Sequence, residues 1–284
     1  YLTEIKKEEP METFIQHAML SWASVTPTVA AVFMTGSRMN PAAVKKESDP
    51  YDFVLVGNPK DVQVTEMDWG EQFSSSILQI GCVENEPYPR YRIFLEDASR
   101  INITVVSEEG MEAFLKKDSL ATVLYDPQEK YQTLEKPNDL TLRTKKPTPK
   151  EYALWCQRFF SDITDVVIAL AEEELVVAQV KLSRAREALL AINRAAVASD
   201  SSFHINLGSD GENLKAYMNE VEYDHLARSY AQTERARIWD AVFQACMLFR
   251  KAGLKLNAVE GFSYPKKLDV DMMRYLRKTW EETR

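Results

Sequence analysis

The order of apolar and polar residues divides the chain into a mixed first half and a helical second half. Short apolar or alternating runs, typical of β-strands, lie at residues 29–35, 52–56, 91–95, 101–106 and 121–125. Apolar residues at helical spacing predict helices over 12–22 and 108–117. The tight connection at 96–100 predicts that the strands on either side of it form a hairpin. We therefore expect a small mixed sheet with helices packed on it.

The second half shows only helical spacing. A boundary is marked by Pro137, Pro147 and Pro149, which lie among charged residues. Beyond it we predict helices over 150–170, 175–197, 213–230, 234–251 and 268–280, with a polar loop at 199–211. The expected fold class is α+β, with a first domain over residues 1–145 and an all-α helical bundle domain over 146–284.

Composition narrows the class of protein. Of 284 residues, 45% are hydrophobic and 27% charged, as in soluble globular proteins. No apolar run reaches the roughly 18 residues of a membrane span. The net charge of −8 argues against DNA as a partner. The odd number of cysteines (Cys82, Cys156 and Cys246) argues against a disulfide framework. We expect a reduced, cytoplasmic protein that binds neither nucleic acid nor membrane.

One motif in the first half carries candidate chemistry. Gly36, Ser37 and Arg38 follow the apolar strand at 29–35, and Asp52 opens the next strand. Small residues let backbone N–H groups approach phosphate oxygens, and the N-terminus of a following helix would add a positive dipole. A carboxylate one strand away can hold the Mg²⁺ that bridges such phosphates. The pattern predicts a site for a nucleoside triphosphate and its metal, and an ordinary strand-to-helix turn is the alternative.

An ordered set of motifs resembles the aminoglycoside 6-adenylyltransferases, the streptomycin-modifying branch of the nucleotidyltransferase superfamily. These motifs are Gly36-Ser37-Arg38 with Asp52, the hairpin residues 93–97 and 101–106, and the later segments 145–148, 246–251 and 264–265. The resemblance covers nearly the whole chain. It implies a nucleotidyltransferase domain and a helical domain, with ATP and substrate bound between them. It also implies transfer of AMP from Mg·ATP to a hydroxyl of an aminoglycoside, assisted by carboxylate-bound metal ions.

The resemblance implies three metal carboxylates, and two of them are replaced in this chain. The second falls on Asp52, the first on Pro50, and the third on Asn102, whose side chain offers only a neutral oxygen. A local bulge could turn the carboxylate of Asp49 toward the metal. Asp97, in the hairpin connection, is a weaker substitute for the third carboxylate, since such a residue more often caps a turn.

The resulting site prediction has two parts. Asp52 and Asp49 are the candidate catalytic and metal-binding residues, with one weakly bound Mg²⁺ held mostly by the triphosphate. The candidate nucleotide-binding residues are Gly36, Ser37, Arg38 and Asn102. The resemblance places a carboxylate that could act as general base at Val180, so no base is assigned.

Three functions remain open at this point. The first is adenylyl transfer from Mg·ATP to a cationic aminoglycoside-like substrate, a reaction of antibiotic resistance. The second is a catalytically inactive relative that binds a nucleotide, a small ligand or a protein partner without transfer. The third is a structural protein whose cleft is empty. The missing carboxylates count against the first, because function depends on the site rather than on the fold.

Overall fold

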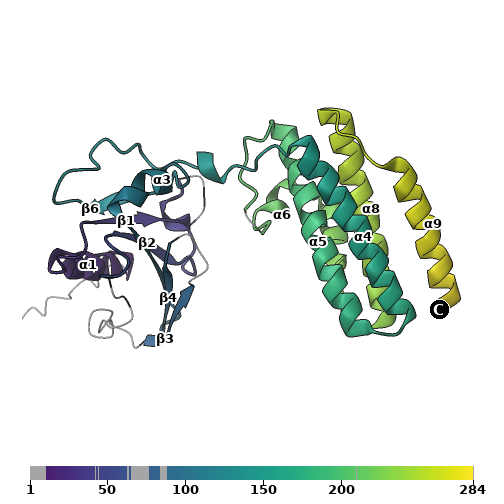
Figure 1. The fold of residues 1–284 in the computed structure, drawn as a ribbon, viewed down its shortest axis with the longest axis horizontal. Coiled ribbons are helices and arrows are strands. Elements are labelled where there is room, and N and C mark those ends of the chain that lie inside the picture. Colours follow the sequence, from purple (N-terminus) through teal and green to yellow (C-terminus); the bar gives the residue numbers. More distant parts are fainter. Residues whose placement is uncertain are drawn as a thin grey trace, which may run out of the picture. The chain divides into compact units, whose positions relative to one another are not determined.

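The chain folds as two compact units, residues 1–142 and 143–284 (Figure 1). The computed structural model describes residues 11–41, 43, 45–62, 64, 77–83, 88–208 and 210–283. The unit boundary falls at Leu142, against residue 145 in the sequence-based division. The first unit contains a mixed sheet with helices, and the described part of the second contains helices without a strand. The predicted α+β class is therefore confirmed.

The sheet of the first unit has six strands in the order β3-β4-β5-β2-β1-β6. They are β1 Ala31–Thr35, β2 Tyr51–Val56, β3 Ile77–Val83, β4 Arg90–Leu95, β5 Arg100–Val106 and β6 Thr122–Tyr125. β2 and β5 run parallel, and the other neighbours are antiparallel. The β4–β5 pairing confirms the predicted hairpin. The edge strand β3 was not predicted, because Gly81 interrupts its apolar run and weakens the strand signal.

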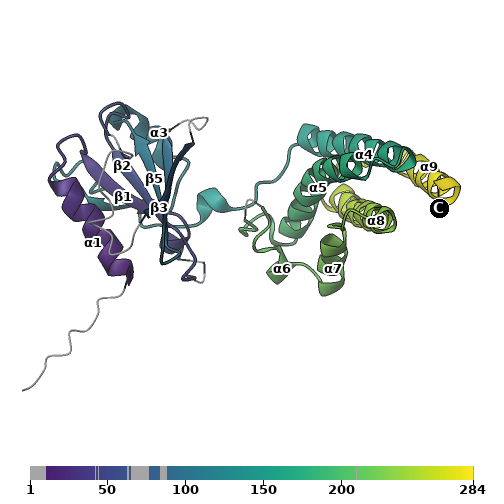
Figure 2. The ribbon, with the colours of Figure 1, turned by 90° about the horizontal axis from the view of Figure 1, so that it is seen from below.

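The two faces of the sheet differ in polarity. On one face Met34, Phe53 and Ile103 pack against Ile15 and Met19 of α1 (Met11–Ser24). On the opposite face an apolar half is covered by α3 (Met111–Leu115), and Figure 2 shows α1 and α3 in these positions. The remaining half of that face carries polar side chains at the start of β2 and β5. Successive side chains of a strand alternate between faces, so these polar side chains project away from the core under α1. They make this half of the face a candidate location for a site.

The helical unit is built on three long helices that lie side by side, α4 (Pro149–Ala171), α5 (Leu175–Ala198) and α8 (Arg235–Glu260) (Figures 1 and 2). Its core includes the stacked rings of Phe159 and Phe249, whose centroids lie 3.9 Å apart. α4 begins with a capping box between Thr148 and Glu151, which satisfies backbone donors of its first turn. None of the described helices combines the length and hydropathy needed to cross a membrane.

Two helix predictions in this unit were wrong. The single helix expected over 213–230 is split into α6 (Leu214–Tyr217) and α7 (Glu220–Arg228). Met218 is extended, at φ −80° and ψ 150°, and the Asn219 side chain accepts the N–H of Val221 at 2.9 Å. Asparagine is favoured at such an N-cap, so the chain starts a new helix there.

α8 continues past residue 251, its predicted end, as far as Glu260, and Gly261 closes it at a φ of 74°. Gly253 lies inside the helix because the ring of Tyr264 packs against it. A Cβ at position 253 would lie 2.5 Å from Cε2 of Tyr264. The glycine therefore serves packing and does not end the helix.

The last helix, α9 (Lys266–Thr283), is joined to α8 by an ion pair whose carboxylate is buried. Arg250 donates from Nε and Nη2 to the two carboxylate oxygens of Asp269, at 2.6 and 2.8 Å. Asp269 is only 4% exposed. Removal of its carboxylate leaves the Arg250 guanidinium without this partner at a packed helix contact.

We predict that Asp269→Ala destabilises the helical unit by about 1–3 kcal/mol, because a charge-assisted hydrogen-bond pair is lost and Arg250 regains only part of its solvation. The matched control is Asp271→Ala on the same helix. Asp271 forms an exposed pair with Arg274 at 3.0 Å, and its loss should cost less than about 0.5 kcal/mol. Calorimetric unfolding of both variants measures the difference, and equal costs would contradict the structural role of Asp269.

Candidate functional site

Asp52 lies at the start of β2, where the polar ends of three strands meet. Its partners in register are Thr35 on β1 and Asn102 on β5. Nδ2 of Asn102 donates to Oδ1 of Asp52 at 2.7 Å. Asp52 is 9% exposed, so its carboxylate is a nearly buried charge that depends on these neighbours.

The turn after β1 leaves room for this carboxylate because it begins with glycine. Gly36 has a φ of 76°, which L side chains rarely adopt, and a Cβ there would lie 2.2 Å from Oδ2 of Asp52. Gly36 and Asp52, both predicted as site residues, are thus in direct contact through backbone and side chain. A residue larger than glycine would displace either the turn or the carboxylate.

The helix expected after the Gly-Ser turn is wrong. Ser37 opens only a single 3₁₀ turn, Ser37–Met39, and Asn40 is already extended at φ −76° and ψ 111°. Pro41 follows, and a proline disfavours helical backbone at the residue before it. The turn therefore supplies no helix dipole to the site.

Arg38 is committed to the loop before β2. Its Nε and Nη2 donate to the carbonyl of Asp49 at 3.0 and 2.8 Å, and Nη2 also donates to the carbonyl of Glu47 at 3.2 Å. The guanidinium carbon lies 3.8 Å from the ring centroid of Tyr51. These contacts show that Arg38 is a buried residue that stabilises the loop before β2. Its predicted contact with phosphate stays a prediction.

The carboxylates weighed as replacement metal ligands lie in turns. Oδ2 of Asp49 accepts the N–H of Lys46 at 2.8 Å, and Oδ1 of Asp97 accepts the N–H of Ser99 at 2.8 Å. Within the described part of the chain, no group of three or more His, Cys, Asp or Glu side chains is placed to hold a metal ion. Metal binding by Asp49 stays a prediction, and it would require Asp49 to leave its turn.

Two residues that were not predicted complete the surroundings of Asp52. Nη2 of Arg90, on β4, lies 3.4 Å from Oδ1 of Asp52. Asp118, which precedes β6, accepts the hydroxyl of Thr35 at 2.6 Å and the N–H of Leu120 at 2.9 Å. The predicted strand began at residue 91, so Arg90 lay one residue before it, and its alternation with Tyr91 and Arg92 was the usable signal for the arginine. Asp118 lies in a connection, and nothing in the local sequence marks it.

The surroundings of Asp52 act on its ionisation in opposite directions. Burial raises the pKa of its carboxyl above the usual 3.8, and the charge of Asp118 adds to the rise. The hydrogen bond from Asn102 and the positive charge of Arg90 lower the pKa but do not outweigh burial. The folded chain therefore bears a free-energy cost for keeping Asp52 ionised.

Comparison with known proteins assigns the family. The sequence profile described as streptomycin adenylyltransferase matches residues 8–279. The chain belongs to this family. The resemblance expected from the motifs is thereby confirmed, and family membership implies use of a nucleotide, and in general of a divalent metal.

Individual relatives of this streptomycin adenylyltransferase family member are distant but match it along most of its length. The Aminoglycoside 6-adenylyltransferase of Bacillus subtilis (strain 168) is 24% identical over 268 residues, covering 91% of this chain and 93% of the relative. The protein of the same name from Campylobacter jejuni is 21% identical over 261 residues, covering 89% and 91%. The crystal structure of an aminoglycoside 6-adenyltransferase from Bacillus subtilis is similar at 19% identity and a TM-score of 0.48, covering 96% of this chain and 99% of that one.

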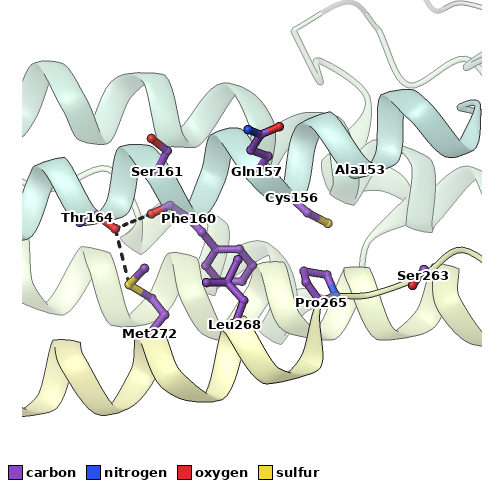
Figure 3. A pocket seen from close by; sticks show the side chains of 10 residues that line it. All are labelled: Ala153, Cys156, Gln157, Phe160, Ser161, Thr164, Ser263, Pro265, Leu268 and Met272. Atoms are coloured by element: carbon purple, nitrogen blue, oxygen red, sulfur yellow. Dashed lines mark hydrogen bonds between the residues drawn. The ribbon is translucent and has the colours of Figure 1, made fainter.

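The helical unit of this family member contains a hollow of about 360 Å³ between α4 and α9 (Figure 3). Phe160 on α4 is directed toward Leu268 on α9, whereas Ser161 points to the other side of α4. Burial raises the pKa of the Cys156 thiol to about 11, so this lining thiol stays protonated and is no nucleophile at neutral pH. The hollow is mainly apolar, and we therefore place the candidate site on the sheet.

We predict that Gly36→Ala destabilises the sheet unit by about 1–3 kcal/mol, because alanine at this φ is strained and its Cβ meets the Asp52 carboxylate. Gly81→Ala on β3 is the control. A Cβ at position 81 meets no described atom within 4 Å, and the change in stability should stay within about 0.5 kcal/mol. Urea unfolding monitored by circular dichroism compares the two, and a silent Gly36→Ala would contradict the close packing of turn and carboxylate.

We predict that Asp52→Asn stabilises the sheet unit at neutral pH. A raised native pKa means that the favourable contribution of Asp52 is present below pH 3.8 and is lost as pH rises through the native pKa. Asparagine does not ionise and can still accept the hydrogen bond from Asn102. The gain of the variant over the wild-type chain should therefore grow from low pH toward pH 8.

Unfolding temperatures at pH 4 and pH 8 measure this difference, with the exposed Asp61→Asn as the control. A variant that is less stable than the wild-type chain at pH 8 would show that the favourable contacts of Asp52 outweigh its burial.

Proposed function

We propose that this family member binds a nucleoside triphosphate at the Asp52 end of the sheet and does not carry out metal-dependent transfer of AMP. The observation that carries the proposal is the hydrogen bond from Nδ2 of Asn102 to Oδ1 of Asp52, at 2.7 Å. The resemblance assigns both positions to metal-binding carboxylates. Here one of the two is an amide that donates a hydrogen bond to the other.

The residues at this position do not fit Mg²⁺. Magnesium prefers oxygen ligands in a near-octahedral arrangement, commonly with one or two carboxylates. Asn102 directs its N–H toward Asp52, and the Arg90 guanidinium lies 3.4 Å from the same carboxylate oxygen. Pro50 has no side-chain ligand at all. A magnesium ion at Oδ1 of Asp52 would face a cation and a hydrogen-bond donor on that same oxygen.

The nucleotide part of the proposal rests on other features. The turn residues Gly36 and Ser37 are only partly buried, so a phosphate can approach their backbone N–H groups from the side that the Asp52 carboxylate does not fill. The polar half of the sheet face beside this turn is lined by Asn102 and Thr104, which are only partly buried, and by the buried Thr35. Membership of a nucleotidyltransferase family makes a nucleotide the first ligand to test.

The competing function is AMP transfer to an aminoglycoside-like cation. It is favoured by the names of the relatives, which are 20–24% identical and match 89–95% of this chain. It requires Asp49 to turn from Lys46 toward Asp52 and to act as a second metal carboxylate. The two functions differ in their need for metal.

Isothermal titration calorimetry of ATP, in EDTA and in Mg²⁺, tests the proposal. We expect ATP to bind in EDTA with an affinity that Mg²⁺ does not raise, and no AMP transfer to streptomycin. The double variant Pro50→Asp with Asn102→Asp restores the two carboxylates, so Mg²⁺ should tighten its binding of ATP. Pro137→Asp with Asn138→Asp makes the same two changes after β6 and should leave the metal dependence unchanged.

Two results would contradict the proposal. ATP binding by the wild-type chain that requires Mg²⁺ would show that a metal site survives through another ligand. Transfer of AMP to streptomycin by the wild-type chain would establish the competing function directly. In that case Asp49→Asn should abolish the transfer.

A further inference from the structure

Two arginines of β4 lie on the same face of the sheet as Asp52. In the antiparallel β4–β5 pair, Arg92 is opposite Asn102 and Arg90 is opposite Thr104. Residues paired across two strands share a face, as do residues two apart on one strand. Since the Asn102 side chain contacts Asp52, both arginines project on the side of the sheet that carries the candidate site.

Arg90 is only weakly engaged by the protein. Its single contact with Asp52, at 3.4 Å, is longer than the roughly 2.7–2.9 Å of a charge-assisted hydrogen bond. Its Nε is buried and finds no acceptor among the described residues. The side chain is 35% exposed, so the outer edge of the guanidinium is accessible. The Arg90 guanidinium therefore has donors that no described residue of the protein engages.

Other arginines of the chain are held in place by several contacts within the protein. Arg38 makes three hydrogen bonds to backbone carbonyls and stacks on Tyr51, and Arg250 makes two short bonds to Asp269. By contrast, the Arg92 side chain is exposed, and no hydrogen bond or ion pair joins its guanidinium to another residue that the structure describes. Packing within the described part of the chain therefore does not explain the two arginines on the face of Asp52.

Among the described residues, the surface beside Arg92 is open at one position of the neighbouring strand. Gly81, on the edge strand β3, is the register partner of Arg92. A Cβ at position 81 would meet nothing within 4 Å in the described part of the chain. With a glycine there, β3 places no side chain beside the Arg92 guanidinium at this pair, and a ligand can lie along the face from Arg92 to Asp52.

We propose that Arg90 and Arg92 bind the phosphate chain of the nucleotide and supply the positive charge that metal ions provide in metal-dependent transfer. A guanidinium presents its N–H groups in a planar fork that matches phosphate oxygens, and it stays charged at any physiological pH. Arg90 also offsets the charge of Asp52, which would otherwise repel a phosphate. The identity of the ligand as a nucleotide rests on the proposed function, whereas the anion site rests on the arginines.

Calorimetric titration in EDTA tests this site with two probes, ATP and inorganic tripolyphosphate. Loss of one guanidinium–phosphate contact, in Arg92→Gln or Arg90→Gln, should weaken both probes about tenfold. Arg92→Lys keeps the charge but loses the planar fork of donors. Its affinities for both probes should lie between those of the wild-type chain and Arg92→Gln. The control Lys116→Gln removes an exposed cation from the same unit and should leave both affinities unchanged. Circular dichroism and thermal unfolding verify that each variant is folded.

The outcomes separate this inference from the proposed function. ATP binding that the arginine variants do not weaken would overturn the arginine site and leave the proposed function standing. Arginine-dependent binding of tripolyphosphate, with ATP bound no more tightly, would support the anion site and contradict a nucleotide ligand. Binding of either probe only when Mg²⁺ is present, or no binding at all, would overturn both.

Discussion

The buried carboxylate of Asp52 is the constraint on which the polar half of the sheet depends. A charge in this position needs hydrogen-bond partners, and the parallel pairing of β2 with β5 brings the Asn102 amide to it at 2.7 Å. The glycine at position 36 leaves the space that the carboxylate fills. Arg90 approaches from β4 and reduces the net charge. The Gly36 turn, the pairing of β2 with β5 and the charge of Arg90 all therefore accommodate the Asp52 side chain.

The same arrangement explains why nucleotide binding and AMP transfer separate in the proposed function. Metal ions in a transferase neutralise phosphates, and they also polarise the reacting phosphoryl group and align the attacking oxygen. A guanidinium supplies charge and hydrogen bonds but does not organise an attacking oxygen as a bound metal does. A site that keeps a cation beside Asp52 in the form of arginine thus retains a means of holding phosphate, and it lacks the carboxylates that would position two metal ions.

Family membership alone does not distinguish these roles. The family profile covers nearly the whole chain, and the relatives are matched over 91–99% of their own length, although no more than 24% of residues are identical. At that distance a fold can persist while single positions of a site change, as the resemblance implies for Pro50 and Asn102. The helical unit has its own core and its own ties, such as Arg250 with Asp269. Substitutions at the sheet site therefore need not disturb it.

The sequence by itself determined the elements with strong local signals. Helical spacing and the prolines identified α4 and α5, alternation identified the β4–β5 hairpin, and the spacing of Gly36 and Asp52 identified two residues that are in contact. Tertiary structure decided the rest. The close packing of Tyr264 against Gly253 within α8, and the surroundings of Asp52, depend on contacts between elements: strand register brings Arg90 and Asp118 to Asp52 from distant segments. Such contacts arise from packing between elements, and no local pattern of residues encodes them.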